Sequence, residues 1–158
     1  MWASQWNMTK IAAPAAWDTQ TDGHDVAVAI IDTGIDFAPP DLSANLDSAN
    51  SFTCMGACVV GGLDDFGHGA HVAGTIGAAA NNGAGIAGIN WRVKMISLKF
   101  LNSGGSGYLS DAVLAYANCG IFSVLARDSG DLEPASPTWA WRAWTLPIPA
   151  PSFSPKRS

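Results

Sequence analysis

Two short segments of the sequence carry side chains that are suited to acid–base chemistry. Asp32 follows an apolar run, Val26–Ile31, and begins an Asp-Thr-Gly turn. His68 lies between two glycines in a segment rich in glycine and alanine. A carboxylate can orient an imidazole and stabilise its protonated form, while the imidazole takes a proton from a nucleophile. A helix that begins at His68 would favour the neutral ring that a general base requires.

The same residues permit other interpretations. Asp32 could only cap its own turn. Asp-Thr-Gly also occurs in aspartic proteases, and a chain with one copy would then have to act as a homodimer. His68 and His71 are three residues apart, so on a helix they share roughly one face and could bind a metal with Asp64 or Asp65. A metal-dependent hydrolase that uses His68, His71 and Asp65 is therefore one hypothesis.

The remaining histidines and the cysteines carry weaker signals. We expect His71 to be packed and hydrogen-bonded, and we expect His24, in a polar stretch, to lie on the surface. Cys54 and Cys58 are close enough in sequence for a local disulfide, or they stay as two thiols. No second Cys or His pair lies near them, which argues against a zinc site.

The elements that would position these side chains alternate between strand and helix. Strands are expected over 26–31, 93–98 and 121–125, and helices over 11–17 (broken early by Pro14), 68–80 and 110–116. Ser110 is a plausible N-cap for the last of these helices. This order predicts an α/β fold with a parallel sheet. Asp32 would lie at the carboxyl end of a strand, where functional groups gather in such sheets.

Composition limits the class of protein. The 158 residues carry a net charge of −5, and 48% are hydrophobic but only 13% are charged. The acidic balance argues against a nucleic-acid partner. No apolar run is long enough to span a membrane, and the first residues do not resemble a signal peptide.

The composition changes along the chain. We predict a globular part over 1–119, an uncertain strand within 120–131 and an irregular, non-homologous tail over 132–158. The tail holds six of the nine prolines and three of the seven tryptophans.

Together these residues resemble a known family, the subtilisin-like serine proteases (subtilases), over about residues 5–118. Val28-Ala29-Ile30-Ile31-Asp32-Thr33-Gly34-Ile35-Asp36 is similar to the segment around that family's catalytic aspartate. Asp65-Phe66-Gly67-His68-Gly69-Ala70-His71-Val72-Ala73-Gly74-Thr75 is similar to the segment around its catalytic histidine. The resemblance implies a three-layer subtilisin-like α/β fold, truncated here, and a serine endopeptidase that hydrolyses peptide bonds.

The resemblance also implies roles for particular residues. Asp32 and His68 would be two members of an Asp-His-Ser triad. A polypeptide substrate would bind as an added strand along Gly104, Gly105, Ser106 and Gly107. No cofactor would be needed for the chemistry, but Asp41 and Asn82 would hold a structural calcium ion. The protein would be monomeric and secreted.

The sequence departs from the family most clearly at the nucleophile. The family's serine lies in a Gly-Thr-Ser-Met-Ala segment, which this sequence lacks. The serines Ser106, Ser110, Ser123 and Ser129 do not lie in such a context. Asp128 would replace the family's oxyanion asparagine, and a carboxylate repels an oxyanion. Smaller departures are Ala70, where a Thr is usual, and Pro39, where a His is common.

These departures predict that the chain alone is inactive, either as an N-terminal fragment of a protease or as a non-catalytic remnant that binds peptides or an inhibitor. A reading frame lost near Cys119, or an internal deletion after about Asn118, would explain the foreign composition that follows. A chain without the rest of the sheet would leave strand edges uncovered, so we also predict marginal folding.

Overall fold

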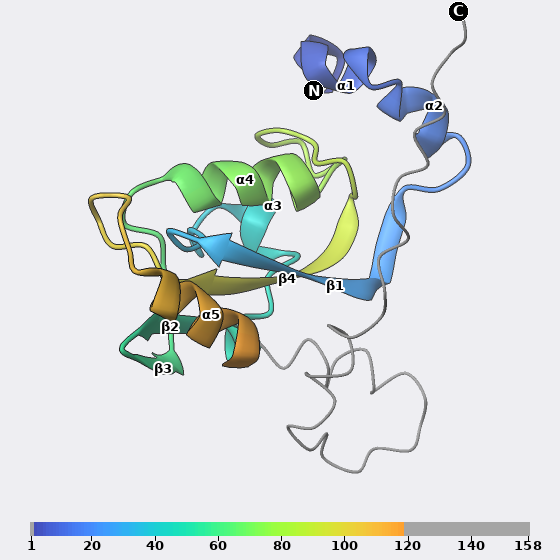
Figure 1. The fold of residues 1–158 in the computed structure, drawn as a ribbon. Coiled ribbons are helices and arrows are strands. Elements are labelled where there is room, and N and C mark those ends of the chain that lie inside the picture. Colours follow the sequence, from blue (N-terminus) through green and yellow to red (C-terminus); the bar gives the residue numbers. More distant parts are fainter. Residues whose placement is uncertain (1, 119–158) are drawn as a thin grey trace, which may run out of the picture. The chain divides into compact units, whose positions relative to one another are not determined.

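The computed structural model describes residues 2–118, and Figure 1 shows their fold. The chain divides into two units, 1–121 and 122–158, and only the first contains described residues. The expected strand over 121–125 and the predicted tail over 132–158 lie outside the described residues. Within residues 2–118, no helix has the length and apolar character that crossing a membrane requires.

A mostly parallel sheet forms the centre of the described part. The sheet has the order β1-β4-β2-β3, with β1 over Asp22–Asp32, β4 over Arg92–Lys99, β2 over Phe52–Met55 and β3 over Ala57–Val60. β4 is parallel to β1 and to β2, while β2 and β3 form an antiparallel hairpin. In this register Asp32 is the neighbour of Lys99, so two polar residues meet at the carboxyl edge.

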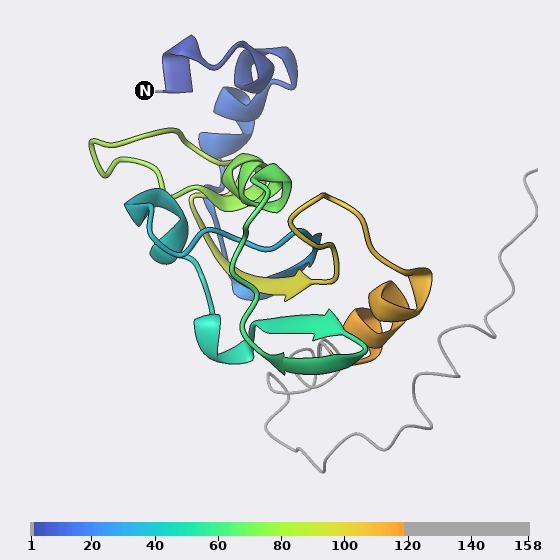
Figure 2. The same ribbon diagram turned by 90° about the vertical axis from the view of Figure 1, so that its left-hand side faces the viewer.

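Helices lie on both faces of the sheet. α4 (His68–Gly77) lies on one face and α5 (Leu109–Asn118) on the other, as Figures 1 and 2 show. Consecutive residues over 95–99 of β4 are buried, as expected for a strand that is covered on both faces. The α/β class and its three-layer arrangement, predicted from the sequence, are therefore confirmed.

The core beneath α4 depends on small residues in the helix. Gly77 has no side chain, and a Cβ there would collide with Val93 and Met95 of β4. The helix therefore packs directly onto the strand. The buried cluster on this face consists of Ile30, Ile35, Leu42, Ala73, Val93 and Met95. Leu42 comes from the short helix α3 (Pro40–Ser43).

The N-terminal segment differs from the prediction of one broken helix over 11–17. Two short helices form, α1 (Trp6–Lys10) and α2 (Ala13–Trp17), after a 3-10 turn over Trp2–Ser4. Pro14 lies in the first turn of α2, where a helix needs no N–H donor, so it starts the helix rather than breaking it. The Trp17 Nε1–H donates to Ile89 O at 2.8 Å and anchors this segment.

Three other predicted boundaries or elements are corrected. The hairpin β2–β3 was not expected, and a disulfide joins its paired residues Cys54 and Cys58. The expected helix over 68–80 ends at Gly77. α5 begins at Leu109, so Ser110 is inside the helix and is not its N-cap. A second short 3-10 turn spans Ser48–Asn50.

Candidate active site

The structure brings Asp32 and His68 into direct contact, although 36 positions separate them in the sequence. His68 Nδ1 lies 2.8 Å from Asp32 Oδ1 and 2.9 Å from Oδ2. A carboxylate only accepts, so Nδ1 donates a ring proton to it, and in the neutral ring Nε2 is then the basic nitrogen. The Asp32 side chain is 15% exposed and that of His68 is 62% exposed. The imidazole is thus held on one side and open to solvent on the other.

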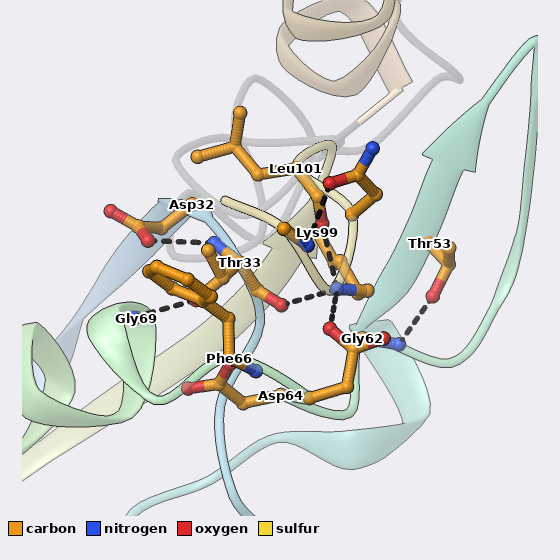
Figure 3. A network of polar contacts seen from close by, with 12 residues as sticks. Asp32, Thr33, Thr53, Gly62, Asp64, Phe66, Gly69, Lys99 and Leu101 are labelled. Carbon is orange, nitrogen blue, oxygen red and sulfur yellow. Dashed lines mark hydrogen bonds and ion pairs between the residues drawn. The ribbon is translucent and has the colours of Figure 1, made fainter. Parts of the chain in front are cut away.

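The turn after β1 fixes the Asp32 carboxylate and the start of α4 at once. The Thr33 N–H donates to Asp32 Oδ1 at 2.6 Å, and the Thr33 hydroxyl accepts from the Gly69 N–H at 2.8 Å (Figure 3). Gly34 has a φ of +121°, which favours glycine. A Cβ on Gly69 would collide with Gly34 O, so the helix can approach this turn only because residue 69 is glycine.

Asp64 stabilises the first turn of α4 from the loop before it. Its Oδ1 accepts from the N–H groups of Phe66 at 3.0 Å and Gly67 at 2.9 Å. Its Oδ2 accepts from the Ala70 N–H at 2.8 Å. Burial raises the pKa of Asp64, but these donors and the Thr33 hydroxyl outweigh burial and hold the pKa below its ordinary value. The carboxylate satisfies backbone donors that a helix start otherwise leaves unpaired.

Lys99 is a buried cation at the end of β4. Its Nζ donates to Thr33 O and to Leu101 O, each at 2.7 Å, and pairs with Asp65 Oδ1 at 2.5 Å. Figure 3 shows the lysine between the Thr33 and Leu101 backbones. This network joins the turn after Asp32, the segment after β4 and the loop before His68.

The predicted peptide-binding segment, 104–107, forms a hydrogen-bonded loop. Asn102 Oδ1 accepts from Gly104 N at 2.9 Å and from Ser106 N at 3.2 Å. The Asn102 N–H in turn donates to Ser106 O at 2.8 Å. Gly105 has a φ of +71°, and a Cβ there would meet the ring of Phe66. Since Phe66 lies two residues before His68, the loop and the Asp32–His68 pair lie on the same side of the molecule.

The predicted calcium residues are also in contact. Asp41 is buried, and its two oxygens accept from Asn82 Nδ2 at 2.6 Å and from Ile86 N at 2.9 Å. A Cβ on Gly85 would collide with Asp41 Oδ2, so the loop over 81–86 closes directly on the carboxylate. The Asn82 amide thus turns its nitrogen to Asp41, while its Oδ1 accepts from Ala84 N at 3.1 Å.

The residues of the metal-hydrolase hypothesis do not come together. His68 faces Asp32, Asp65 pairs with Lys99, and the Asp64 carboxylate is used by the α4 backbone. Within residues 2–118, no three His, Cys, Asp or Glu side chains converge as metal ligands.

His71 is exposed, which corrects the expectation that it is packed. It lines a pocket with Gln5, Trp6 and Ile86. The reason is helical geometry: the buried face of α4 carries Gly69, Ala73 and Gly77, and position 71 is on the opposite face. His24 falls in β1, but its side chain lies outside the described part of the structure.

Comparison with known proteins identifies the class that this fold and site define. Residues 23–119 match the family described as Subtilase family, which is more than half of the chain. The chain therefore belongs to the subtilases, which are serine-type endopeptidases, and the predicted resemblance is confirmed.

Individual relatives agree with this assignment. The chain is 43% identical over 98 residues to an intracellular serine protease of Paenibacillus polymyxa. The aligned region covers 61% of this chain and 29% of the relative. It is 35% identical over 103 residues to thermitase of Thermoactinomyces vulgaris, an alignment that covers 65% of this chain and 36% of the relative. It is 39% identical over 105 residues to subtilisin Savinase of Lederbergia lenta, an alignment that covers 66% of this chain and 36% of the relative. The chain thus spans only about a third or less of the length of these relatives.

Three contributors to the site were missed in the sequence. Asp64 was considered only as a metal ligand, and neither Lys99 nor Asn102 was singled out. A signal existed for Asn102, because Asn often receives backbone N–H groups in turns and precedes a Ser-Gly-Gly run here. Lys99 carried a fainter signal, as a charged residue at the end of an apolar strand.

Proposed function

We propose that this chain carries the aspartate–histidine half of a serine endopeptidase active site, with Asp32 and His68 as its two members. The observation that carries the proposal is the contact of His68 Nδ1 with the Asp32 carboxylate at 2.8 Å and 2.9 Å. In peptide-bond hydrolysis, Asp32 would hold the Nδ1–H tautomer. His68 Nε2 would then accept the proton of a serine hydroxyl and return it to the leaving amine.

The chain contains no serine in the family's Gly-Thr-Ser-Met-Ala context. An acyl-enzyme needs that hydroxyl, so we propose that the chain alone does not turn over peptides. Assay of the full chain on a fluorogenic peptide amide should show only the blank rate. Turnover that disappears in His68→Ala would contradict this part of the proposal.

The half-site can be tested without the serine by an alkylating peptide. A peptidyl chloromethyl ketone that binds along 104–107 should bring its CH₂–Cl carbon to His68 Nε2. The nitrogen then forms a C–N bond and chloride leaves. Peptide mapping by mass spectrometry gives the alkylation rate at each histidine.

His71 is the matched internal control, because it is an exposed imidazole on the same helix. Chloroacetone, which has the same reactive group but no peptide, is the comparison reagent. We expect the ratio of alkylation rates, His68 over His71, to be about tenfold higher with the peptidyl reagent than with chloroacetone, because a bound electrophile has a raised local concentration. Equal preference with both reagents would refute the half-site. Tight binding of the peptide without alkylation of His68 would instead favour a binding remnant.

We also propose a structural calcium ion held by Asp41 and Asn82 with carbonyl oxygens of the loop over 81–86. It would have no part in bond cleavage; its positive charge would replace the Asn82 Nδ2–H at the Asp41 carboxylate. Support comes from the closure of the loop on this buried carboxylate.

We propose secretion as the location of the protein. The disulfide between Cys54 and Cys58 supports it, since disulfides persist in oxidising compartments. Trapping free thiols in freshly harvested cells and medium tests the proposal: a protein found in the cytosol with both thiols free would exclude it.

A further inference from the structure

Lys99 is an unusual residue for its position in the fold. It is the last residue of β4, and its side chain is only 6% exposed. Lysine is almost never fully buried without partners, because removing an ammonium group from water is costly. The neighbouring positions Ser97 and Leu98 are also buried, so the strand end is enclosed on both faces. Something at this place must compensate the burial of the charge.

The compensation is complete, because three acceptors meet the three donors of the ammonium group. They are Thr33 O at 2.7 Å, Leu101 O at 2.7 Å and Asp65 Oδ1 at 2.5 Å. The Asp65 side chain is 50% exposed, so one member of the ion pair remains solvated. A hydrophobic residue of similar length would fill the space, but it would leave two backbone carbonyls without this donor.

The three acceptors belong to three different segments of the candidate site. Thr33 directly follows Asp32, and its N–H and hydroxyl already hold Asp32 and the start of α4. Leu101 leads into the segment over 104–107. Asp65 lies in the loop that ends at His68. One side chain therefore spans the segments that carry the acid–base pair and the peptide-binding loop.

We propose that Lys99 is a positioning residue that sets the distance between the Asp32–His68 pair and the peptide-binding loop. This inference rests on the proposed function of that pair. Lys99 itself does not touch substrate: it fixes the Thr33 carbonyl and with it the turn that orients the Asp32 carboxylate. Loss of the ammonium group frees that turn and the Leu101 segment from each other.

The chain contains a matched control on the same strand. Lys94 is also in β4, but its residue is exposed. Lys94→Met removes the same charge from the same element without touching the network. A change that reflects only the loss of one positive charge, or of one lysine from β4, should appear in both variants.

The test compares Lys99→Met with Lys94→Met in the full chain, labelled with ¹⁵N-histidine. Nitrogen chemical shifts report which ring nitrogen of His68 carries the proton, and His68→Gln assigns the signals. We expect the parent and Lys94→Met to show the Nδ1–H tautomer. In Lys99→Met we expect a mixture of tautomers and about a tenfold slower alkylation of His68 by the peptidyl reagent, with the amide spectrum of β1 and β4 retained.

Each remaining outcome bears on the proposal. A folded Lys99→Met chain with the parental tautomer and alkylation rate overturns it. If Lys99→Met does not fold, Asp65→Asn replaces it, since this half-exposed position keeps an oxygen acceptor but loses the charge. Asp65→Asn should give a smaller shift in the same direction, and no shift would then overturn the proposal. If the parent shows no preference for His68 over His71, the proposed function fails, while the tautomer comparison still tests Lys99.

Discussion

At the scale of single residues, the Asp32 carboxylate accepts hydrogen bonds from two donors, the Thr33 N–H and the His68 ring. In Asp32→Asn the amide still fits, but one of its two positions is an NH₂ group that cannot accept from Nδ1–H. We expect His68 to lose its fixed tautomer and its alkylation to slow by about tenfold or more. Nitrogen chemical shifts and peptide mapping provide the measurement. Asp36→Asn, in the same turn region, should leave both readouts unchanged.

Ionisation of Asp64 is expected to make the free energy of unfolding depend on pH in the acidic range. Its pKa lies below the ordinary value of 3.8 in the folded chain, so folding favours its ionised form. This contribution is fully present above about pH 5 and is lost as the pH falls through 3.8 towards the lower folded value. The difference in unfolding free energy between the parent and Asp64→Asn should therefore shrink from about pH 6 to about pH 3.

Denaturant unfolding followed by tryptophan fluorescence measures that difference. Other carboxylates are common to both proteins, so their titration cancels. A difference that stays constant across the pH range would show that the Asp64 charge is not what the α4 backbone uses.

The residue types singled out Asp32 and His68, and the family resemblance predicted their contact, which the structure shows. Asp32 and His68 stand beside glycines in distinctive segments, and the family resemblance gives them roles. The supporting residues were not predictable in this way. Lys99 acts mainly through Thr33, 66 positions away, whereas Asp64 bonds backbone groups two to six residues ahead, which is a local capping role that we did not predict for it.

At the scale of elements, the approach of α4 to the turn after β1 depends on Gly69. We expect Gly69→Ala to lower the free energy of unfolding by about 2–3 kcal/mol, because the new methyl group collides with the Gly34 carbonyl. Chemical denaturation measures the loss. Gly74→Ala is the matched control on the same helix.

At Gly74 the nearest atom to a new Cβ is Ile86 Cδ1, at 3.2 Å, which is the end of a flexible side chain. Alanine favours helix over glycine by about 1 kcal/mol, so this variant should be neutral or more stable. If Gly69→Ala and Gly74→Ala lower the free energy of unfolding equally, the helix tolerates no substitution of glycine by alanine, and the close contact at Gly69 is not the cause.

The loop over 81–86 supports a calcium prediction of its own. Adding calcium to chelator-treated protein should raise the thermal midpoint, because an ion that binds only the folded state stabilises it. Asp41→Asn should abolish the rise, and Asp18→Asn, at an exposed position, should not. A rise that survives Asp41→Asn would place the ion elsewhere.

Sequence patterns predicted the 26–31 part of β1 and the 93–98 part of β4 as short strands, and α4 as a stretch rich in alanine and glycine. The hairpin β2–β3 has no such pattern. Its second strand is mostly exposed, so no alternation between buried and exposed positions marks it. The pairing of Cys54 with Cys58 and the contact of Gly56 N with Asp111 Oδ1 hold it instead. The sequence offered the local disulfide, but the contact with Asp111, 55 positions away, leaves no local pattern.

At the scale of the whole molecule, the described part of the chain exposes several large apolar side chains. Among residues 2–118, β1 and β3 are the outer strands of the sheet, and several exposed apolar side chains lie near β3 and α5. These include Val59, Val60, Leu109 and Val113. Exposed edges and patches of this kind promote association between chains.

We therefore expect a broad thermal transition and self-association that increases with protein concentration. Calorimetry and sedimentation velocity over about a tenfold concentration range provide the measurements. A sharp, concentration-independent transition of a monomer would contradict this expectation and would show that the described unit is covered well enough to fold alone.

The pairing of β1 with β4 also determines when the site can exist during synthesis. Asp32 is made early, but its neighbour in the sheet is Lys99, and His68 lies between them in sequence. A nascent chain that ends before β4 contains both acid–base residues yet has no strand to hold the first of them in place. Since β4 follows both residues in the sequence, we expect the pair to take its folded geometry only after β4 has been made. We therefore expect a nascent chain that stops before Arg92 to leave the His68 ring without a fixed partner.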